Sequence, residues 1–271
     1  MSTSTAFDRA RAEDRAALVG YLPAGFPTVE GSIEALRAMV DAGCDVIEIG
    51  LPYSDPVMDG PTIQAAAQQA LEGGVRTGDV LRVVEAVAAT GTPTLVMTYW
   101  NPVERYGVEA FARDLSAAGG AGLITPDITP DYGQQWIAAA DEHDLDKVFL
   151  IAPSSTDERI AMTTAACRGF VYATAVMGVT GARTTTSELA GPLVARAKAA
   201  TSLPIGVGLG VSNGAQAAEL ASYADGVIVG SAFVRAVQEH AGDLAAGTRA
   251  LSALTEDLAH GVRAGRGAVR A

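Results

Sequence analysis

Two carboxylates in one short segment could divide acid–base chemistry between them. Glu48 interrupts an apolar run two residues before its end, where a buried charge is costly unless it is used or paired. Asp59 follows eleven residues later, in a loop rich in proline and glycine. Two carboxyl groups at one site can act as acid and base when their surroundings separate their pKa values. Taken singly, Glu48 is equally well explained by a structural ion pair, and Asp59 by an ordinary turn or helix cap.

Three glycine-bearing segments indicate a site for a small phosphate. They are GVTGAR (178–183), GVGLGVS (206–212) and VGSAF (229–233), and the last of them adds the hydroxyl of Ser231. The second and third segments coincide with predicted strand ends, where backbone N–H groups and the start of a short helix often bind phosphate in barrels. The alternative is that these glycines serve tight turns only, and GVG alone is weak evidence for a dinucleotide.

Other mechanisms lack suitable residues. Of the two lysines, Lys147 begins a predicted strand, at the wrong end of a barrel, and Lys198 lies in a helical segment, which disfavours a Schiff-base aldolase. The three histidines fall in helical or C-terminal segments, so a catalytic zinc has no obvious ligands and no metal is expected. Cys44 and Cys167 fit no metal spacing or disulfide framework.

The elements that must position these residues alternate along the chain. Short apolar runs predict eight strands, at 17–22, 45–50, 93–99, 122–125, 147–151, 170–175, 204–207 and 226–229. Segments with helical spacing lie between them, such as 29–42, 63–71 and 80–89. This α/β pattern predicts a (β/α)8 TIM barrel that forms a single domain over residues 1–271, with a short N-terminal helix. An open doubly wound sheet is the competing architecture.

The spacing of the strands predicts where the barrel carries its site. Extended loops are expected after strands two and six, at 51–62 and 178–188, and a barrel places them at its C-terminal face, where active sites are built. The ends of the chain, 1–7 and 262–271, are expected to be flexible.

The overall charge limits the kinds of molecule that the protein is expected to bind. Lysine and arginine number 19 against 31 aspartates and glutamates, a net charge of −12, which repels phosphate backbones and argues against nucleic acid. No long apolar run predicts a membrane span, and no signal peptide is recognised, so the expected location is cytoplasmic.

Taken together, the motifs resemble the tryptophan synthase alpha chain family. The resemblance covers nearly the whole chain in order, and the loop PYSDPxxDGPTIQ is its most specific part. Besides the three glycine segments it rests on YLPAGFP (21–27), EIGLPYSDPVMDGPTIQ (48–64), TYWNPV (98–103), AGGAGLITPD (118–127) and APSS (152–155).

The resemblance implies a TIM-barrel lyase that cleaves indole-3-glycerol phosphate to indole and glyceraldehyde 3-phosphate in tryptophan biosynthesis. It implies no cofactor in this chain. Indole would pass to a beta subunit that uses pyridoxal phosphate, within an alpha2-beta2 complex.

The resemblance also implies residue roles. Glu48 would be the general acid–base, Asp59 would accept the indole N–H, and Tyr172 would line the pocket beside them. The remaining roles are phosphate binding by Gly181, Gly210, Gly230 and Ser231, an indole pocket of Tyr21, Met97, Ile124 and Leu209, a lid with Thr180, and a partner interface of Pro52, Asp55, Pro56, Asn101 and Pro102.

The chain departs from the family at several places, and two other functions compete. Ala175-Val176 stands where many members have Ser-Arg, and Phe26 where aspartate is frequent. One alternative is a lyase that works without a beta partner. The other is a catalytically silent barrel that serves as a scaffolding subunit, against which the presence of both Glu48 and Asp59 argues.

Overall fold

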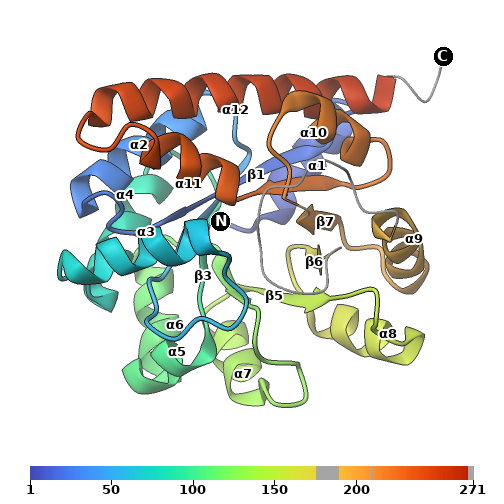
Figure 1. Ribbon diagram of the computed structural model, residues 1–271. Coiled ribbons are helices and arrows are strands. Elements are labelled where there is room, and N and C mark those ends of the chain that lie inside the picture. Colours follow the sequence, from blue (N-terminus) through green and yellow to red (C-terminus); the bar gives the residue numbers. More distant parts are fainter. Residues whose placement is uncertain (175–188, 209, 268–271) are drawn as a thin grey trace.

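A closed barrel of eight parallel strands forms the centre of the molecule (Figure 1). The computed structural model describes residues 1–174, 189–208 and 210–267. The strands run in sequence order around the barrel, which confirms the predicted TIM barrel and excludes an open sheet. They are β1 (Ala17–Pro23), β2 (Val46–Gly50), β3 (Thr94–Met97), β4 (Gly122–Thr125), β5 (Asp146–Ile151), β6 (Val171–Thr174), β7 (Ile205–Gly208) and β8 (Gly226–Val229).

Helices surround the barrel, and Figure 1 shows them packed around the strands. They are α1 (Ser4–Ala12), α2 (Val29–Asp41), α3 (Pro61–Glu72), α4 (Thr77–Ala88), α5 (Trp100–Tyr106), α6 (Val108–Ala117), α7 (Gln134–Glu142), α8 (Asp157–Ala166), α9 (Ala190–Ala200), α10 (Gly214–Ala221), α11 (Ser231–Gln238) and α12 (Leu244–Gly267). All eight predicted strands and the three predicted helical segments are present, with boundaries shifted by a few residues at most.

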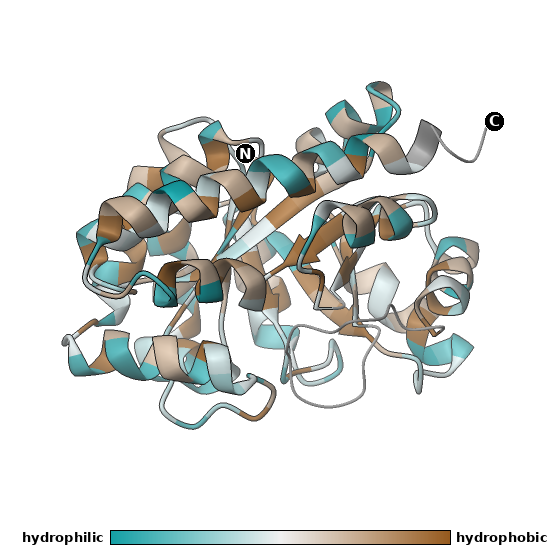
Figure 2. Ribbon diagram, turned by 45° about the horizontal axis from the view of Figure 1, so that its top comes forward, coloured by the Kyte–Doolittle hydropathy of each residue, from teal (hydrophilic) through white to brown (hydrophobic). Residues whose placement is uncertain are grey.

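The helices pack against the barrel through apolar residues that lie along one face of each helix. In α4 the residues Val80, Val83, Val84 and Val87 recur at helical spacing, and all four are buried. Figure 2 shows the same division across the molecule, with hydrophobic strands inside and hydrophilic residues on the outer surfaces of the helices. Within the described ranges, no helix combines the length and the apolar character that crossing a bilayer requires.

The N-terminal helix closes one end of the barrel. Phe7 of α1 packs against Phe170, with ring centroids 5.1 Å apart, among the apolar side chains that fill the barrel. A side chain at Gly226 would bring its Cβ within 2.6 Å of the Phe7 ring, so glycine in β8 makes room for this contact. The chain before α1 is held by Asp146, which accepts hydrogen bonds from Thr3 N (2.7 Å) and Thr3 Oγ1 (2.6 Å).

The flexibility expected of residues 1–7 and 262–271 stays a prediction, although helices include 4–7 and 262–267 and residues 268–271 lie outside the described residues. Asp146 binds Thr3 and the barrel interior binds Phe7, and nothing in the local sequence signals these contacts. At the other end α12 continues to Gly267 and packs against α2, α10 and α11, so residues 262–267 are helical. Apolar residues of α12 pack against these neighbouring helices, so the helix continues into the segment that was expected to be flexible.

The predicted long loop after β2 is present. It runs from Leu51 to Gly60, where Pro61 begins α3, and it leaves the barrel at the carboxyl end of the strands. The other expected loop, at 178–188, lies outside the described residues.

A buried ion pair joins the segments that precede β1 and β2 at the opposite end of the barrel. Arg15 and Asp45 are about 95% buried and form two hydrogen bonds, of 2.6 and 2.9 Å. Asp45 also accepts a hydrogen bond from Leu18 N at 2.9 Å. Arg15 Nε also contacts the half-exposed carboxylate of Glu13 at 2.7 Å. Because Arg15 and Asp45 are both removed from water, loss of Asp45 leaves the buried guanidinium group with this weaker partner.

We expect Asp45→Asn to lower the free energy of unfolding by about 3 kcal/mol, because the buried guanidinium group of Arg15 then keeps only the half-exposed carboxylate of Glu13, 2.7 Å from Nε, as a counter-ion among the described residues. The matched control is Glu30→Gln, which removes an exposed contact with Arg82 of 3.4 Å and should cost less than about 1 kcal/mol. Urea unfolding of both variants measures the difference, and equal effects would contradict the structural role of the pair.

Candidate active site

Glu48 points into the carboxyl end of the barrel, and no charged partner for it lies among the described residues. It lies in β2 on the same face as Val46, which belongs to the apolar filling of the barrel, and opposite Tyr21 and Leu95 on the neighbouring strands. Its side chain is 1% exposed, and Oε1 has no hydrogen-bond partner among the described residues. Burial raises the pKa of Glu48 to about 8. The carboxyl group is therefore mainly protonated at neutral pH and can donate a proton before it accepts one.

Asp59 is brought over the barrel mouth by the loop after β2. Its Oδ1 accepts a hydrogen bond of 3.1 Å from the hydroxyl of Tyr99, and its backbone oxygen accepts one of 2.7 Å from Gln64 in α3. Burial raises the pKa of Asp59, and the bond from Tyr99 acts in the opposite direction. Two carboxyl groups with different surroundings thus lie at one end of the barrel, where both act on Tyr21.

Two tyrosines complete the cluster, and glycines on the neighbouring strands make space for them. A Cβ on Gly50 would lie 2.3 Å from the hydroxyl oxygen of Tyr21, and a Cβ on Gly208 would lie 2.4 Å from that of Tyr172. Burial, and after it the negative charge of nearby Glu48, raises the pKa of Tyr172. Burial, then Asp59 and Glu48, raises the pKa of Tyr21. Both hydroxyls are therefore close to the carboxyl groups and stay protonated.

Those expected pocket and phosphate residues that the structure describes lie at the same end of the barrel as Glu48. Met97 in β3 pairs in register with Ile124 in β4 and with Gly50 in β2. Gly230 caps α11, and Ser231 is the first residue of that helix, where backbone N–H groups are free to bind an anion.

The segments after β7 and β8 leave adjacent strands, because Gly208 pairs with Ile228. Gly210 has φ +74°, a left-handed conformation that glycine adopts without strain. Three further predicted site residues lie outside the described residues: Leu209, Thr180 and Gly181.

The expected partner residues differ in their exposure. Asp55 and Asn101 are exposed, and Pro56 and Pro102 are half-buried. Pro52 is buried, so it supports the loop from inside and offers little surface to another chain. Asn101 Nδ2 donates a hydrogen bond of 3.0 Å to the Tyr53 hydroxyl, which links the loops after β2 and β3.

Sequence reasoning missed Tyr99, whose hydroxyl binds Asp59 directly. The available signal was its place after the third strand, in the motif TYWNPV, where a barrel directs side chains toward the same mouth. The bond itself spans forty residues of sequence and depends on how the loop after β2 folds back.

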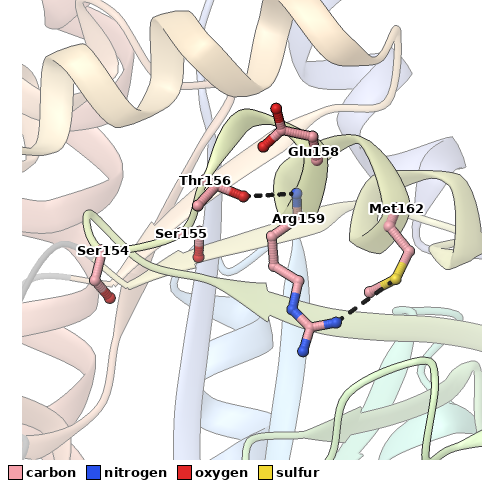
Figure 3. Close-up of a pocket in the computed structure, with 6 residues that line it drawn as sticks. All are labelled: Ser154, Ser155, Thr156, Glu158, Arg159 and Met162. Atoms are coloured by element: carbon pink, nitrogen blue, oxygen red, sulfur yellow. Dashed lines mark hydrogen bonds between the residues drawn. The ribbon is translucent and has the colours of Figure 1, made fainter.

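A separate shallow pocket of about 410 Å³ lies at the start of α8 (Figure 3). Within it Thr156 accepts a hydrogen bond from Arg159 N, and the guanidinium group of Arg159 contacts the sulfur of Met162. Its lining contains none of the predicted site residues, so it is distinct from the Glu48 cluster. The lining residues are Ser154, Ser155, Thr156, Glu158, Arg159 and Met162.

A closed parallel barrel with two carboxyl groups of raised pKa at the carboxyl ends of its strands defines a TIM-barrel enzyme of the acid–base type. The family model described as "Tryptophan synthase alpha chain" matches residues 7–263. The tryptophan synthase alpha chain of Salinispora arenicola is 66% identical over 258 residues, which cover 95% of this chain and 96% of that one. The chain belongs to the tryptophan synthase alpha chain family.

Solved structures agree with this assignment. Tryptophan synthase from Mycobacterium tuberculosis superposes with a TM-score of 0.91 at 59% identity, over 96% of this chain and 98% of that one. The tryptophan synthase complex from Pyrococcus furiosus gives 0.83 at 32% identity, over 90% and 98%. The family is a lyase of tryptophan biosynthesis that cleaves indole-3-glycerol phosphate to indole, and pyridoxal phosphate belongs to its beta subunit. The predicted family, fold and activity are confirmed.

The raised pKa of Glu48 makes stability depend on pH. The unfolded chain loses this proton above about pH 4.5 and the folded chain only near pH 8, so this group destabilises the fold as pH rises between these values. Over that window Glu48→Gln should gain about 1.4 kcal/mol of stability over the parent for each pH unit. Thermal unfolding followed by circular dichroism from pH 5 to pH 8 measures the difference. A difference that stays constant with pH would show that Glu48 is not a buried neutral acid.

Proposed function

We propose that Glu48 carries both proton transfers of the family's carbon–carbon cleavage. As an acid it protonates the indole ring carbon that bears the glycerol chain. As the resulting carboxylate it takes the proton from the adjacent side-chain hydroxyl, and the bond between the two carbons breaks to release indole and glyceraldehyde 3-phosphate. Glu48 ends the cycle protonated. The observation that carries this proposal is the burial of Glu48 with no counter-ion in the part of the chain that the structure describes, which supports a neutral acid at physiological pH.

Asp59 stabilises the charged intermediate in this proposal. Protonation of the ring carbon leaves a positive indolenine, whose charge is shared with the ring nitrogen. A carboxylate that accepts the ring N–H lowers the energy of that state more than the energy of the neutral substrate, as catalysis requires. Tyr172 lines the space beside both carboxyl groups, and its proximity to Glu48 supports this placement.

The rest of the rim binds the two ends of the substrate. Ser231 and the backbone around Gly210 and Gly230, together with Gly181, hold the phosphate, because helix starts and glycine turns present free N–H groups. Tyr21, Met97, Ile124 and Leu209 form the apolar slot for indole. Thr180 lies outside the described residues, and its role in a lid that excludes water during turnover is proposed from the family resemblance alone.

We also propose how the chain works in its complex. It forms a single domain, holds no cofactor of its own, acts in the cytoplasm and assembles with beta subunits as an alpha2-beta2 complex. The contact surface includes Asp55, Pro56, Asn101 and Pro102, at the mouth from which indole leaves. A docked mouth retains a small apolar product that would otherwise diffuse away.

Indole release from indole-3-glycerol phosphate tests the chemistry. Glu48→Gln and Asp59→Asn keep the size of each side chain and remove its acid–base function, and each should lower kcat by about 10²- to 10⁴-fold. Both variants should still bind glycerol phosphate by calorimetry, because the phosphate residues are unchanged. Glu30→Gln is the control and should retain full activity. Substantial turnover by Glu48→Gln would remove Glu48 from the mechanism.

Sedimentation velocity with a beta subunit tests the assembly. We expect a particle of two alpha and two beta chains, and we expect Asp55→Lys to weaken its formation at least tenfold, since it reverses an exposed charge on the proposed surface. Activity of the isolated variant should equal that of the parent chain. Absence of a complex with the parent chain would rule out the partner assignment.

A further inference from the structure

The carboxyl group of Asp59 is held by a residue from the neighbouring loop. The hydroxyl of Tyr99, which follows β3, donates to Asp59 Oδ1 at 3.1 Å and accepts from the backbone N–H of Met58 at 3.0 Å. Because Met58 supplies a proton to the hydroxyl oxygen, the hydroxyl's own proton is directed at Asp59. One oxygen atom therefore fixes two successive residues of the loop after β2.

Tyr99 is itself rigidly placed. Its side chain is 6% exposed, and its ring packs against that of Tyr53 with centroids 5.4 Å apart. The next residue, Trp100, donates its backbone N–H to both carboxylate oxygens of Asp127 at 3.0 Å, which anchors the start of α5 to the segment after β4. The hydroxyl thus reaches Asp59 from a fixed base, whereas Asp59 lies at the end of a ten-residue loop, Leu51–Gly60.

The surroundings of Asp59 make this contact important for its charge. Among the described residues Asp59 forms no ion pair with lysine or arginine. The titratable groups that face it are the hydroxyls of Tyr99 after β3 and Tyr21 in β1. Burial favours the neutral acid, and a hydroxyl donor favours the carboxylate. A neutral Asp59 could not stabilise a positive heterocycle.

We propose that Tyr99 is a positioning residue for the lyase reaction, whose hydroxyl orients the Asp59 carboxylate toward the heterocycle and keeps it charged during turnover. This inference rests on the proposed role of Asp59. Tyr99 acts through Asp59 and takes no part in proton transfer itself, because burial and the charge of Asp59 raise the pKa of Tyr99 to about 12.

Tyr99→Phe removes the hydroxyl and keeps the ring that packs on Tyr53. Without the donor the pKa of Asp59 rises, so the acidic limb of the kcat/KM profile should move to higher pH. At neutral pH kcat should fall about tenfold, with a smaller change in KM, since the lost contact acts mainly on the charged intermediate. The matched control is Tyr53→Phe, which removes only the bond from Asn101 and should leave the acidic limb in place.

A double-mutant cycle separates positioning from a general structural effect. If Tyr99 acts through Asp59, adding Tyr99→Phe to Asp59→Asn should cost almost nothing further in kcat. A full, additive tenfold loss in the double variant would overturn the proposal. So would a parental pH profile and kcat in Tyr99→Phe. If Asp59→Asn itself keeps parental activity, the proposed role of Asp59 fails instead, and the two failures are distinguishable.

A second substitution and a substrate-free readout cover the case in which Tyr99→Phe does not fold. Incorporation of 3-fluorotyrosine at position 99 keeps the ring and makes the hydroxyl a stronger donor, so the acidic limb should move to lower pH. Carbon-13 NMR of labelled aspartate carboxyl groups, assigned with Asp59→Asn, follows the Asp59 titration without substrate. It should show the same direction of change, and an unmoved Asp59 titration would overturn the inference.

Discussion

The burial of one carboxyl group on β2, which no cation among the described residues compensates, is the constraint on which the site depends. A glutamate that is 1% exposed and faces the barrel interior would be strongly destabilising as an anion, so the fold keeps it as a neutral acid. A lysine or arginine beside it would lower the free-energy cost of the buried anion. It would also remove the proton donor, because the pKa of Glu48 would fall below the working range. The chemistry therefore requires the omission of a stabilising partner that most buried carboxylates have.

The barrel tolerates this cost because its two ends have different roles. At the end where the strands begin, Arg15 and Asp45 pair fully, Asp146 binds the chain before α1, and Phe7 fills the opening. The charged groups named there have partners. At the end where the strands finish, Glu48 Oε1 has no partner among the described residues, and the glycines of β2 and β7 make room for tyrosines. Stability from the first end offsets the free-energy cost of the buried carboxyl group at the second.

The sequence predicted the secondary-structure elements more fully than the contacts between them. All eight strands were predicted because buried parallel strands are short apolar runs, and the interruption of one run by Glu48 is what indicated the candidate site. Contacts between distant segments were not predicted. The bond from Tyr99 to Asp59, the burial of Pro52 and the bonds from Thr3 to Asp146 all depend on how loops and ends fold onto the barrel. Such contacts have no periodicity that a local pattern could reveal.

The two carboxyl groups also differ in how they are held, and the difference matches the tasks proposed for them. Glu48 lies on a strand, where register with β1 and β3 fixes its backbone, and a proton donor must keep one position for both transfers. Asp59 lies on a loop, where it can adjust to the heterocycle but needs an external support to remain charged and aligned. Tyr99 supplies that support from the adjacent strand end. A shift of the loop after β2 would therefore move Asp59, whose charge stabilises the intermediate, and would leave Glu48 in place. The same loop presents Asp55 to the proposed partner.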